Sequence, residues 1–334
     1  MSDSVRIGIV GLGRLGRRHA ENLALRVPGA QLVAAASPIA DERAWAETAL
    51  PGVTTYAGLT ELLAHPGLDA VWLVTPTSLH AAQVAEAIEA GKHVFCEKPL
   101  ALEPADCDKV IALAESRPRQ LVMIGFMRRF DPAYAEAKRR IAAGEIGDVF
   151  AITTRSEDPV DPNGFFVKFA PTSGGIFLDC CIHDIDLVRW MLDGAEVSTV
   201  TAAGSRIMYP ALGGCSDVDN GFATVTFKGG QVATFHVSRT SHRGYEALMT
   251  VVGTKGALEI GKAVPRLPLT IESDGARAVT GQVDFFERFG EAFLHEARAF
   301  VEAVQSGGPT PSGVADAKAA TAIACAMREA LVVG

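Results

Sequence analysis

The chain has 334 residues, which exceeds the usual size of one domain, so we expect two domains with separate cores. Its composition, 48% hydrophobic and 21% charged, predicts a folded chain rather than a disordered one. The formal net charge of −8 argues against nucleic acid as a partner, because contacts to phosphates need a surplus of Lys and Arg. Small polar or neutral molecules remain as ligands.

The cysteines form no C-x-x-C pair and show no regular spacing, so we interpret them as reduced core thiols and predict no metal site. The first residues do not have the basic start and apolar block of a secretory signal. The sequence also has no uninterrupted apolar run of about 18 residues, the length that a membrane span requires. We therefore expect a cytoplasmic protein without a membrane partner.

Short apolar runs alternate with helical patterns between residues 5 and 126. The runs are VRIGIV (5–10), QLVAAA (31–36), VTTYA (53–57), DAVWLVTP (69–76), HVFCE (93–97) and QLVMIGF (120–126). Helical patterns, with apolar residues at i, i+3 and i+4, occupy residues 16–27, 80–91 and 104–116. Apolar strands separated by amphipathic helices imply a parallel sheet covered on both faces. The sequence thus predicts a doubly wound α/β domain of the Rossmann type at residues 1–126.

The pattern changes after a helix that we expect to begin at Pro132, with Asp131 as its N-cap. One long helix is predicted over 173–192. Alternating strands follow at 196–207, 220–227, 231–239, 247–253 and 257–261, with a tight hairpin at 228–230. Two helices, at about 284–305 and 312–332, complete the pattern. We expect residues 127–334 to form an α+β domain with a large, mostly antiparallel sheet.

The first predicted strand runs into GLGRLG, in which Gly11, Gly13 and Gly16 have the G-x-G-x-x-G spacing. In this motif the first glycine permits a tight turn, the second lets a pyrophosphate approach the backbone, and the third lets helix and strand pack. The following helix, which begins with Arg14 and Leu15, points its N-terminus at the phosphates. A strand before the motif and a helix after it predict dinucleotide binding by these five residues.

The end of the second strand, at Ser37, lacks the acidic residue that usually holds the adenosine ribose of NAD. Without a carboxylate to repel a 2′-phosphate, the sequence predicts loose discrimination against NADP. Arg43 either reaches such a phosphate or lies on a solvated helix face. We expect Ser37 to contact the cofactor and take that cofactor to be NAD, with NADP as the alternative.

Two further polar stretches follow predicted strands, where a doubly wound sheet binds its ligand. VTPTSLH follows the fourth strand, and CEKPL follows the fifth, with Lys98 held before a proline. In another sequence, the acidic and basic residues of CEKPL would be interpreted as a surface ion pair. Beside the glycine motif, six residues are assigned to the cofactor site: Thr75, Pro76, Thr77, His80, Glu97 and Lys98.

The stretch SGGIFLDCCIHDIDLVRWML (173–192) places polar residues in an otherwise apolar segment. If it forms one helix, Asp179, His183 and Asp186 share one face at i, i+4 and i+7. Apolar residues surround them, so these polar groups must face a cavity or a partner. Arg189, three residues after Asp186, is predicted to form a structural ion pair with it.

Several motifs together resemble one enzyme family. They are GLGRLGRRHAENL, EKPL, GFMRRFDPAYAEAK, EIGDVFAITTRSEDP, GGIFLDCCIHDIDLVRW and VVGTKGALEI. The sequence resembles the Gfo/Idh/MocA oxidoreductases over nearly its whole length, and among them the inositol 2-dehydrogenases. The resemblance implies a Rossmann domain and a second domain with an open sheet that commonly forms dimers or tetramers. It also implies hydride exchange between nicotinamide and a cyclic polyol or sugar.

The resemblance further implies that Lys98, Asp179 and His183 are catalytic. Oxidation of a secondary alcohol needs a base for the hydroxyl proton, and the imidazole of His183 is suited to that role. Asp179 would orient the imidazole or hold a neighbouring hydroxyl, while Lys98 would polarise the oxygen that becomes a carbonyl. The division in which Lys98 is the base stays open.

Substrate contacts are assigned by resemblance or by position in a polar stretch. They are expected from Lys98, Arg128, Arg155, Glu157, Asp179, His183 and Tyr245. Three alternatives are an interdomain salt bridge for Arg128, ordinary strand packing for Tyr245, and a polar loop without ligand over RSEDPVDPNGFFVKF.

The predicted function is an NAD(P)-dependent dehydrogenase that oxidises a ring hydroxyl of inositol, myo or scyllo, or of a related cyclic polyol. One alternative is an aldose or sugar dehydrogenase of the same family. Another, from a different class, is a non-catalytic NAD(P)-binding redox sensor with the same fold. We expect a homo-oligomer, either a dimer or a tetramer.

Overall fold

The computed structural model describes residues 4–261, 270–273, 276–279 and 284–334. The chain divides into two compact units. The first unit contains the described residues up to Met127 together with Glu291–Thr321, and the second contains those of Arg128–Gly290 together with Ala322–Gly334. The predicted domains, 1–126 and 127–334, differ from these units mainly in residues 291–321, which belong to the first unit.

The first unit is built on a six-stranded sheet in the order β3-β2-β1-β4-β5-β6. All of its neighbouring strands run parallel, which confirms the predicted Rossmann fold. The strands are β1 (Val5–Val10), β2 (Ala30–Ala36), β3 (Thr54–Tyr56), β4 (Ala70–Leu73), β5 (His93–Glu97) and β6 (Val122–Gly125). The inner strands read as continuous apolar runs because both of their faces are buried, whereas the edge strand β3 is partly exposed.

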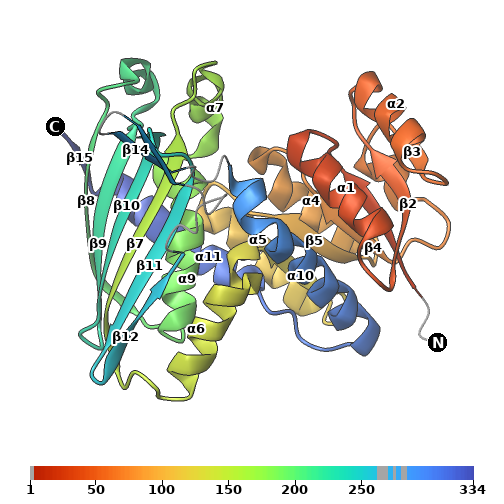
Figure 1. Ribbon diagram of the computed structural model, residues 1–334. Coiled ribbons are helices and arrows are strands. Elements are labelled where there is room, and N and C mark those ends of the chain that lie inside the picture. The colour runs from red at the N-terminus through yellow and green to blue at the C-terminus, as the bar shows by residue number, and fades with distance from the viewer. Residues whose placement is uncertain (1–3, 262–269, 274–275, 280–283) are drawn as a thin grey trace. The chain divides into compact units, whose positions relative to one another are not determined.

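Helices follow the strands in the order that a doubly wound sheet requires (Figure 1). They are α1 (Arg14–Leu25), α2 (Ala40–Ala49), α3 (Leu59–Leu63), α4 (Thr77–Glu89) and α5 (Pro104–Ser116). Each crossover returns the chain to the same edge of the sheet, so the turns after β1, β2, β4 and β5 open toward one side.

Helix α10 (Phe285–Ser306) supplies the packing that brings residues 291–321 to the first unit. Its Phe293 ring lies 5.4 Å from that of His19, and its Phe300 ring lies 5.4 Å from that of Trp72. The segment after α10 then pairs with β6, where Ser312 accepts from Ile124 N at 3.0 Å and its hydroxyl donates to Ile124 O at 2.6 Å. The sequence prediction missed this return because periodicity identifies a helix but not the surface that it covers.

The second unit is built on a seven-stranded sheet in the order β12-β11-β7-β10-β9-β8-β15. The strands are β7 (Val149–Pro159), β8 (Val197–Ser205), β9 (Asn220–Phe227), β10 (Val232–Ser241), β11 (Glu246–Gly253), β12 (Gly256–Ile260) and β15 (Leu331–Val333). Four strand pairs are antiparallel, whereas β10 with β7 and β15 with β8 are parallel. The mostly antiparallel sheet and the hairpin between β9 and β10 are therefore confirmed, whereas strand β7 was not predicted.

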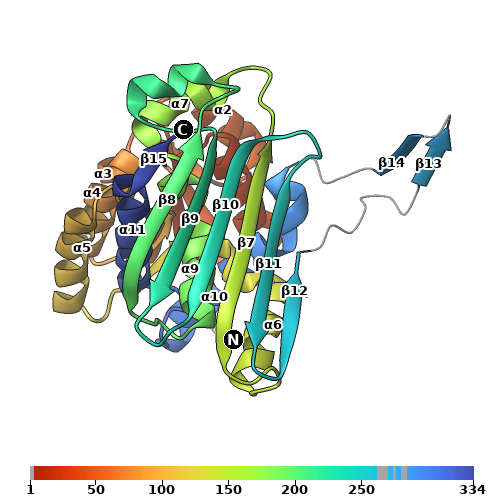
Figure 2. The ribbon, with the colours of Figure 1, turned by 90° about the vertical axis from the view of Figure 1, so that its left-hand side faces the viewer.

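One face of this sheet is packed against helices, including α6 (Pro132–Ala142) and α9 (Ile182–Met191). Figure 2 shows the strands in front of these helices, so the opposite face carries no helix from the described residues of the second unit. Helix α6 begins as predicted, since the Asp131 carboxylate accepts from the backbone N–H groups of Ala133 and Tyr134.

The predicted helix over 173–192 is wrong, because this segment contains the last residue of one helical piece and two further pieces. Helix α7 (Phe165–Ser173) ends before Gly174 and Gly175, which have positive φ angles of 80° and 88°. The four-residue α8 (Ile176–Asp179) follows, and a turn at residues 180–181 separates it from α9. Apolar residues on all three pieces face the core, so the apolar periodicity continued across the breaks.

The last helix, α11 (Val314–Glu329), continues from the first unit into the second. A separate two-stranded hairpin consists of β13 (Thr270–Ser273) and β14 (Ala276–Val279). Across the described ranges, the helices fall short of the length and apolar character that a membrane span requires.

Candidate active site

The glycine turn after β1 has the geometry that a bound pyrophosphate requires. Gly11 has a φ angle of +92°, and a Cβ atom there would overlap the carbonyl oxygen of Val74. A Cβ atom at Gly16 would likewise overlap the carbonyl oxygen of Gly11, so α1 packs closely on the turn. Gly13 is different, because outside the adjoining backbone only Glu42 Oε1 lies within 4 Å of its Cβ position. The second glycine therefore leaves its backbone open to a ligand, which fits a dinucleotide.

The N-terminus of α1 provides the charge complement for this ligand. Gly13 is the N-cap residue and supplies no side-chain hydrogen bond to the first turn, and that turn contains no acidic residue. The helix N-terminus therefore presents backbone N–H groups and a partial positive charge to an anion. Arg14 is exposed and Leu15 is half-buried beside this turn.

The end of β2 is occupied by a carboxylate that the sequence prediction overlooked. Ser37 is buried and its hydroxyl donates to Glu42 Oε2 at 2.5 Å. Arg43, which was predicted to contact a 2′-phosphate or lie on a solvated helix face, donates from Nη1 to the Ser37 carbonyl oxygen at 2.7 Å. The expectation that this strand end has no acidic group is therefore wrong, because Glu42 reaches it from the first turn of α2.

The turn after β4 carries the predicted TPT segment at the same edge of the sheet. Pro76 is exposed and is the N-cap residue of α4, and Thr77 is half-buried in its first turn. The Thr75 hydroxyl donates to the Gln83 side chain at 2.5 Å, which fixes its rotamer. These three residues remain candidates for cofactor contacts.

His80 connects two of the strand ends instead of facing solvent. Its Nδ1 lies 2.7 Å from the carbonyl oxygen of Pro99, and its Nε2 lies 2.7 Å from that of Thr75. Burial lowers the pKa of the imidazole, although these two carbonyl contacts act in the opposite direction. The side chain is 1% exposed, so the role that we assign to it is to position the two turns.

Glu97 and Lys98 lie at the end of β5, with the acidic residue turned inward. The carboxylate of Glu97 is 2.8 Å from His19 Nε2, and both side chains are buried. The second carboxylate oxygen accepts the backbone N–H of Lys98 at 3.2 Å. Lys98 itself is half-buried. Glu97 therefore holds the backbone from which the Lys98 side chain extends.

A second buried carboxylate, Glu296 of α10, lies near Glu97. Neither Glu296 oxygen has a hydrogen-bond partner among the described residues, and the side chain is fully buried. Burial raises the pKa of Glu296 well above its usual value, and the charge of Glu97 raises it further. Glu296 therefore keeps its proton at pH values where an exposed glutamate is ionised.

We expect the Glu296→Gln variant to be more stable than the parent at high pH. Because the pKa of Glu296 is raised in the folded state, binding of its proton contributes to the free energy of unfolding. This contribution is complete below the unfolded-state pKa of about 4.3 and is lost as the pH rises toward the folded-state pKa. The neutral amide of the variant does not titrate, so the variant does not lose stability in this way. The free energy of unfolding of the variant minus that of the parent should therefore grow by about 1.4 kcal/mol per pH unit between the unfolded-state and folded-state pKa values. Unfolding in urea at pH 5, 7 and 9 measures it.

The matched control for this experiment is Glu302→Gln, which changes an exposed glutamate on the same helix. This control removes the same charge at an exposed position, so it separates the effect of burial from that of losing a carboxylate. A pH-independent difference for Glu296→Gln would mean that Glu296 ionises in the folded protein as it does in the unfolded chain.

In the second unit, the half-buried Asp179 forms an ion pair with a buried arginine that the sequence prediction missed. Asp179 ends α8, and its carboxylate accepts from the guanidinium of Arg239 on β10. The guanidinium also lies 4.5 Å above the ring of Phe166. Cys180 Sγ lies 3.4 Å from Asp158 Oδ2 and 3.7 Å from Asp179 Oδ2, so two carboxylates and one guanidinium gather on the helix-covered face.

His183 lies in the first turn of α9, beyond the break that separates it from Asp179. His183 is buried, with 8% of its surface exposed. The predicted single helix through Asp179 and His183 is interrupted by a turn at residues 180–181. Arg239 gives Asp179 an orienting partner on the sheet.

Arg128 is the centre of a buried network within the second unit. Its Nη1 donates to Ser156 Oγ and to Asp184 Oδ1, both at 2.9 Å, and its Nη2 donates to the Tyr245 hydroxyl at 3.0 Å. Burial raises the pKa of Tyr245 to about 12, so the phenol keeps its proton at neutral pH. The structure thus joins Arg128 and Tyr245, both predicted substrate contacts, in one network with Asp184.

The predicted ion pair between Asp186 and Arg189 is replaced by another. Asp186 accepts from Arg129 Nη2 at 2.5 Å and from Arg129 Nε at 2.8 Å, and both side chains are buried. The guanidinium of Arg129 also lies 5.8 Å from the ring of Trp190. This bidentate pair holds α9 to the chain that precedes α6.

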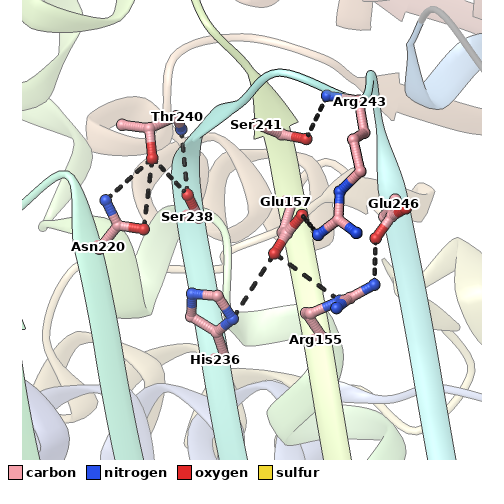
Figure 3. Close-up of polar contacts among 9 residues, drawn as sticks. All are labelled: Arg155, Glu157, Asn220, His236, Ser238, Thr240, Ser241, Arg243 and Glu246. Carbon is pink, nitrogen blue, oxygen red and sulfur yellow. Dashed lines mark hydrogen bonds and ion pairs between the residues drawn. The ribbon is translucent and has the colours of Figure 1, made fainter. Parts of the chain in front are cut away.

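Arg155 and Glu157 lie on the open face of the sheet. Successive side chains alternate along β7, so Ser156 and Asp158 point to the helix-covered face, whereas Arg155 and Glu157 point away from it. Figure 3 shows these two residues beside His236 and Arg243. The distance from Glu157 Oε1 to His236 Nδ1 is 3.7 Å. Arg155 and Glu157 therefore lie on the face of the sheet opposite to Asp179. The residue of β7 that lies near Asp179 is Asp158.

A surface pocket of about 250 Å³ surrounds Glu157 on this open face. It is lined by Glu157, Asn220, His236, Ser238, Thr240, Ser241, His242 and Arg243. The Glu157 carboxylate also lies 3.7 Å from Arg155 Nε, and Arg155 pairs with Glu246 as well. Burial lowers the pKa of His236, although Glu157 acts in the opposite direction. The charged side chains around this pocket thus largely pair with one another.

Sequence reasoning missed two residues, and only the first of them had a detectable signal. Arg239 interrupts the inward-facing positions of β10, which otherwise alternate as Ala233, Phe235 and Val237, so an inward-pointing charge was visible in the pattern. Glu42 lies five residues after Ser37 in the first turn of a predicted helix, but its contact with the strand end depends on the turn between them.

The first unit has a six-stranded Rossmann sheet, and its first turn fits a pyrophosphate. The second unit contains buried ionisable groups. Together these features are typical of a nicotinamide-dependent oxidoreductase. Residues 5–126 match the family model described as "Oxidoreductase family, NAD-binding Rossmann fold", and residues 134–259 match the "GFO/IDH/MocA C-terminal domain". The chain belongs to the Gfo/Idh/MocA family and is an NAD-dependent oxidoreductase.

Several similar proteins are named as inositol dehydrogenases. The scyllo-inositol 2-dehydrogenase (NAD(+)) of Bacillus subtilis is 39% identical over 92% of this chain and 88% of its own length. The myo-inositol 2-dehydrogenase of Thermotoga maritima is 33% identical over 98% of this chain and 96% of its own length. The crystal structure of scyllo-inositol dehydrogenase from Lactobacillus casei with bound NAD(H) and scyllo-inositol has a TM-score of 0.93 and 36% identity, covering 98% of this chain and 97% of that one.

Proposed function

We propose that this chain oxidises a ring hydroxyl of myo-inositol, scyllo-inositol or a related cyclic polyol to the ketone. NAD, when bound, accepts the hydride that leaves the ring carbon. The similar proteins named for scyllo-inositol and for myo-inositol support this class of substrate. Since they differ in the isomer, the proposal covers both.

The remaining steps are assigned to residues of this chain. His183 removes the hydroxyl proton as the hydride leaves. Asp179, oriented by Arg239, holds a neighbouring hydroxyl, and Lys98 polarises the oxygen that becomes the carbonyl. Thr75, Pro76 and Thr77 are proposed to contact the cofactor.

The observation that carries this proposal is the group of ionisable residues on the helix-covered face of the second sheet. Asp158, Asp179 and Arg239 lie together where the surrounding side chains are mostly apolar. Charged groups in such a position are costly unless they are paired, and clusters of them gather at functional sites. Two carboxylates and a fixed cation also suit a ligand that presents several hydroxyl groups.

An initial-rate screen tests the proposal. Inositol isomers, aldoses and sugar acids would each be offered with NAD and with NADP, and kcat/KM would be compared. We expect the highest value for an inositol isomer with NAD. A higher value for an aldose would identify a sugar dehydrogenase, and cofactor binding without turnover of any substrate would favour a redox sensor.

We also propose a cytoplasmic homo-oligomer. The open face of the second sheet supports contact between copies, since Phe222 is 51% exposed there and its ring stacks on His236 at 4.3 Å. Light scattering of the purified protein gives the mass in solution. A monomer at micromolar concentration would contradict this proposal.

A further inference from the structure

The carboxylate of Glu42 lies between two parts of the Rossmann unit that face a dinucleotide. Its Oε2 accepts the Ser37 hydroxyl at 2.5 Å, at the end of β2. Its Oε1 is 3.9 Å from the position that a Cβ atom would take at Gly13, the open glycine of the phosphate turn. One side chain thus connects the strand end to the turn over which the pyrophosphate would lie.

The contacts of Ser37 fix the direction of this carboxylate. The Ser37 hydroxyl donates to Glu42 and accepts the backbone N–H of Ile39 at 3.1 Å, so its rotamer is determined from both sides. Because Ser37 is 1% exposed, it cannot offer this hydroxyl to a ligand while these bonds persist. Glu42 is only half-buried and has a second oxygen directed toward the glycine turn. The polar group that a ligand meets here is therefore Glu42.

The nearby cations already have partners. Arg43 donates to the Ser37 carbonyl oxygen at 2.7 Å. Arg17 donates from Nε to the Leu12 carbonyl oxygen at 3.1 Å, and its guanidinium lies 4.8 Å from the ring of Trp45. No ion pair between Glu42 and a cation is found among the described residues. The Glu42 carboxylate is therefore not committed to a neighbouring cation in the described part of the chain.

In a Rossmann unit the adenosine ribose lies beside the pyrophosphate, at the end of the second strand. We propose that Glu42 binds the ribose hydroxyls of NAD and repels the 2′-phosphate of NADP. The residue thus takes over, from the first turn of α2, a role usually supplied by an acidic residue at the strand end itself. This inference concerns the cofactor and does not depend on the polyol substrate.

The test uses ligands that lack nicotinamide, so it is independent of turnover. ADP-ribose and its 2′-phosphorylated form would be titrated calorimetrically into the parent, Glu42→Gln, Glu42→Asp and the control Asp41→Asn. Asp41 is an exposed neighbour on the same helix turn, so its variant removes one negative charge without touching Ser37. Thermal unfolding of each variant shows that the fold is retained.

We expect the parent to prefer ADP-ribose, and Glu42→Gln to lose about tenfold or more of that preference, since it loses the charge and one of the two acceptor oxygens. Glu42→Asp should bind ADP-ribose more weakly yet still reject the 2′-phosphate, and Asp41→Asn should remain within about twofold of the parent. An unchanged preference in Glu42→Gln would overturn the inference. A parent that prefers the 2′-phosphate would overturn it too and would point to Arg43.

Discussion

Replacing His183 by alanine is expected to lower kcat by about a hundredfold or more, the usual contribution of a general base. The residue lies in the first turn of α9, in the same unit as the Asp179–Arg239 pair. The glycine turn that is proposed to bind the pyrophosphate belongs to the other unit, so the affinity for NADH should change little. Steady-state kinetics at saturating NAD, together with a fluorescence titration of NADH, measures both quantities.

The control for this variant is His242→Ala, since His242 is an exposed histidine of the same unit. It should keep the parent kcat within about twofold. Near-normal turnover of His183→Ala with the best polyol would remove His183 from the mechanism. A loss of NADH binding would instead mean that the substitution acts on the cofactor.

Replacing Lys98 by methionine is expected to lower kcat by a similar factor, about a hundredfold or more, because one charged donor to the developing oxyanion is lost. Methionine keeps an unbranched stem of similar length, so the local packing should persist. Glu97 holds the Lys98 backbone N–H through its own carboxylate, and that contact does not need the lysine side chain. NADH binding should therefore remain, as a fluorescence titration would show.

Lys109→Met serves as the control, because Lys109 is an exposed lysine paired only across one helix turn with Asp106. The pH profile of kcat/KM then assigns the base. If His183 takes the proton, activity rises with pH as the imidazole loses its own proton, and this limb should persist in Lys98→Met. A Lys98→Met enzyme that lost this limb would make Lys98 the base, and one that failed to bind NADH would place Lys98 in a different role.

The Rossmann sheet could be predicted because its inner strands are buried on both faces and therefore appear as unbroken apolar runs. Strand β7 could not, since Arg155 and Glu157 face the open side and its neighbours β10 and β11 are distant in sequence. The helix over 173–192 was predicted as continuous because the apolar periodicity of α8 and α9 crosses the turn between them. Helix α7 was not predicted, because most of it lies in a stretch that was interpreted as a polar loop. Local patterns therefore located α8 and α9, but neither α7 nor the breaks.

Candidate site residues were predictable where they followed a motif and less so where a tertiary contact decided their role. Gly11 and Gly16 have the steric environment that the glycine spacing implies. Ser37 was identified at the correct strand end, but its hydroxyl is used internally and Glu42 provides the exposed group. Asp179 was identified, whereas its partner Arg239 lies 60 residues away on another element. The catalytic roles of Lys98, Asp179 and His183 stay predictions.

The path of the chain between the two units limits what can be separated by cutting it. In the described part of the chain the polypeptide passes from one unit to the other three times, after Met127, Gly290 and Thr321. A fragment ending at residue 127 would lose Phe300, whose ring covers Trp72, and would leave β6 without its Ser312 partner. The nucleotide-binding unit is thus not autonomous as a linear segment. A stable version of it would have to include residues 291–321, joined back to residue 127 by a linker in place of the second unit.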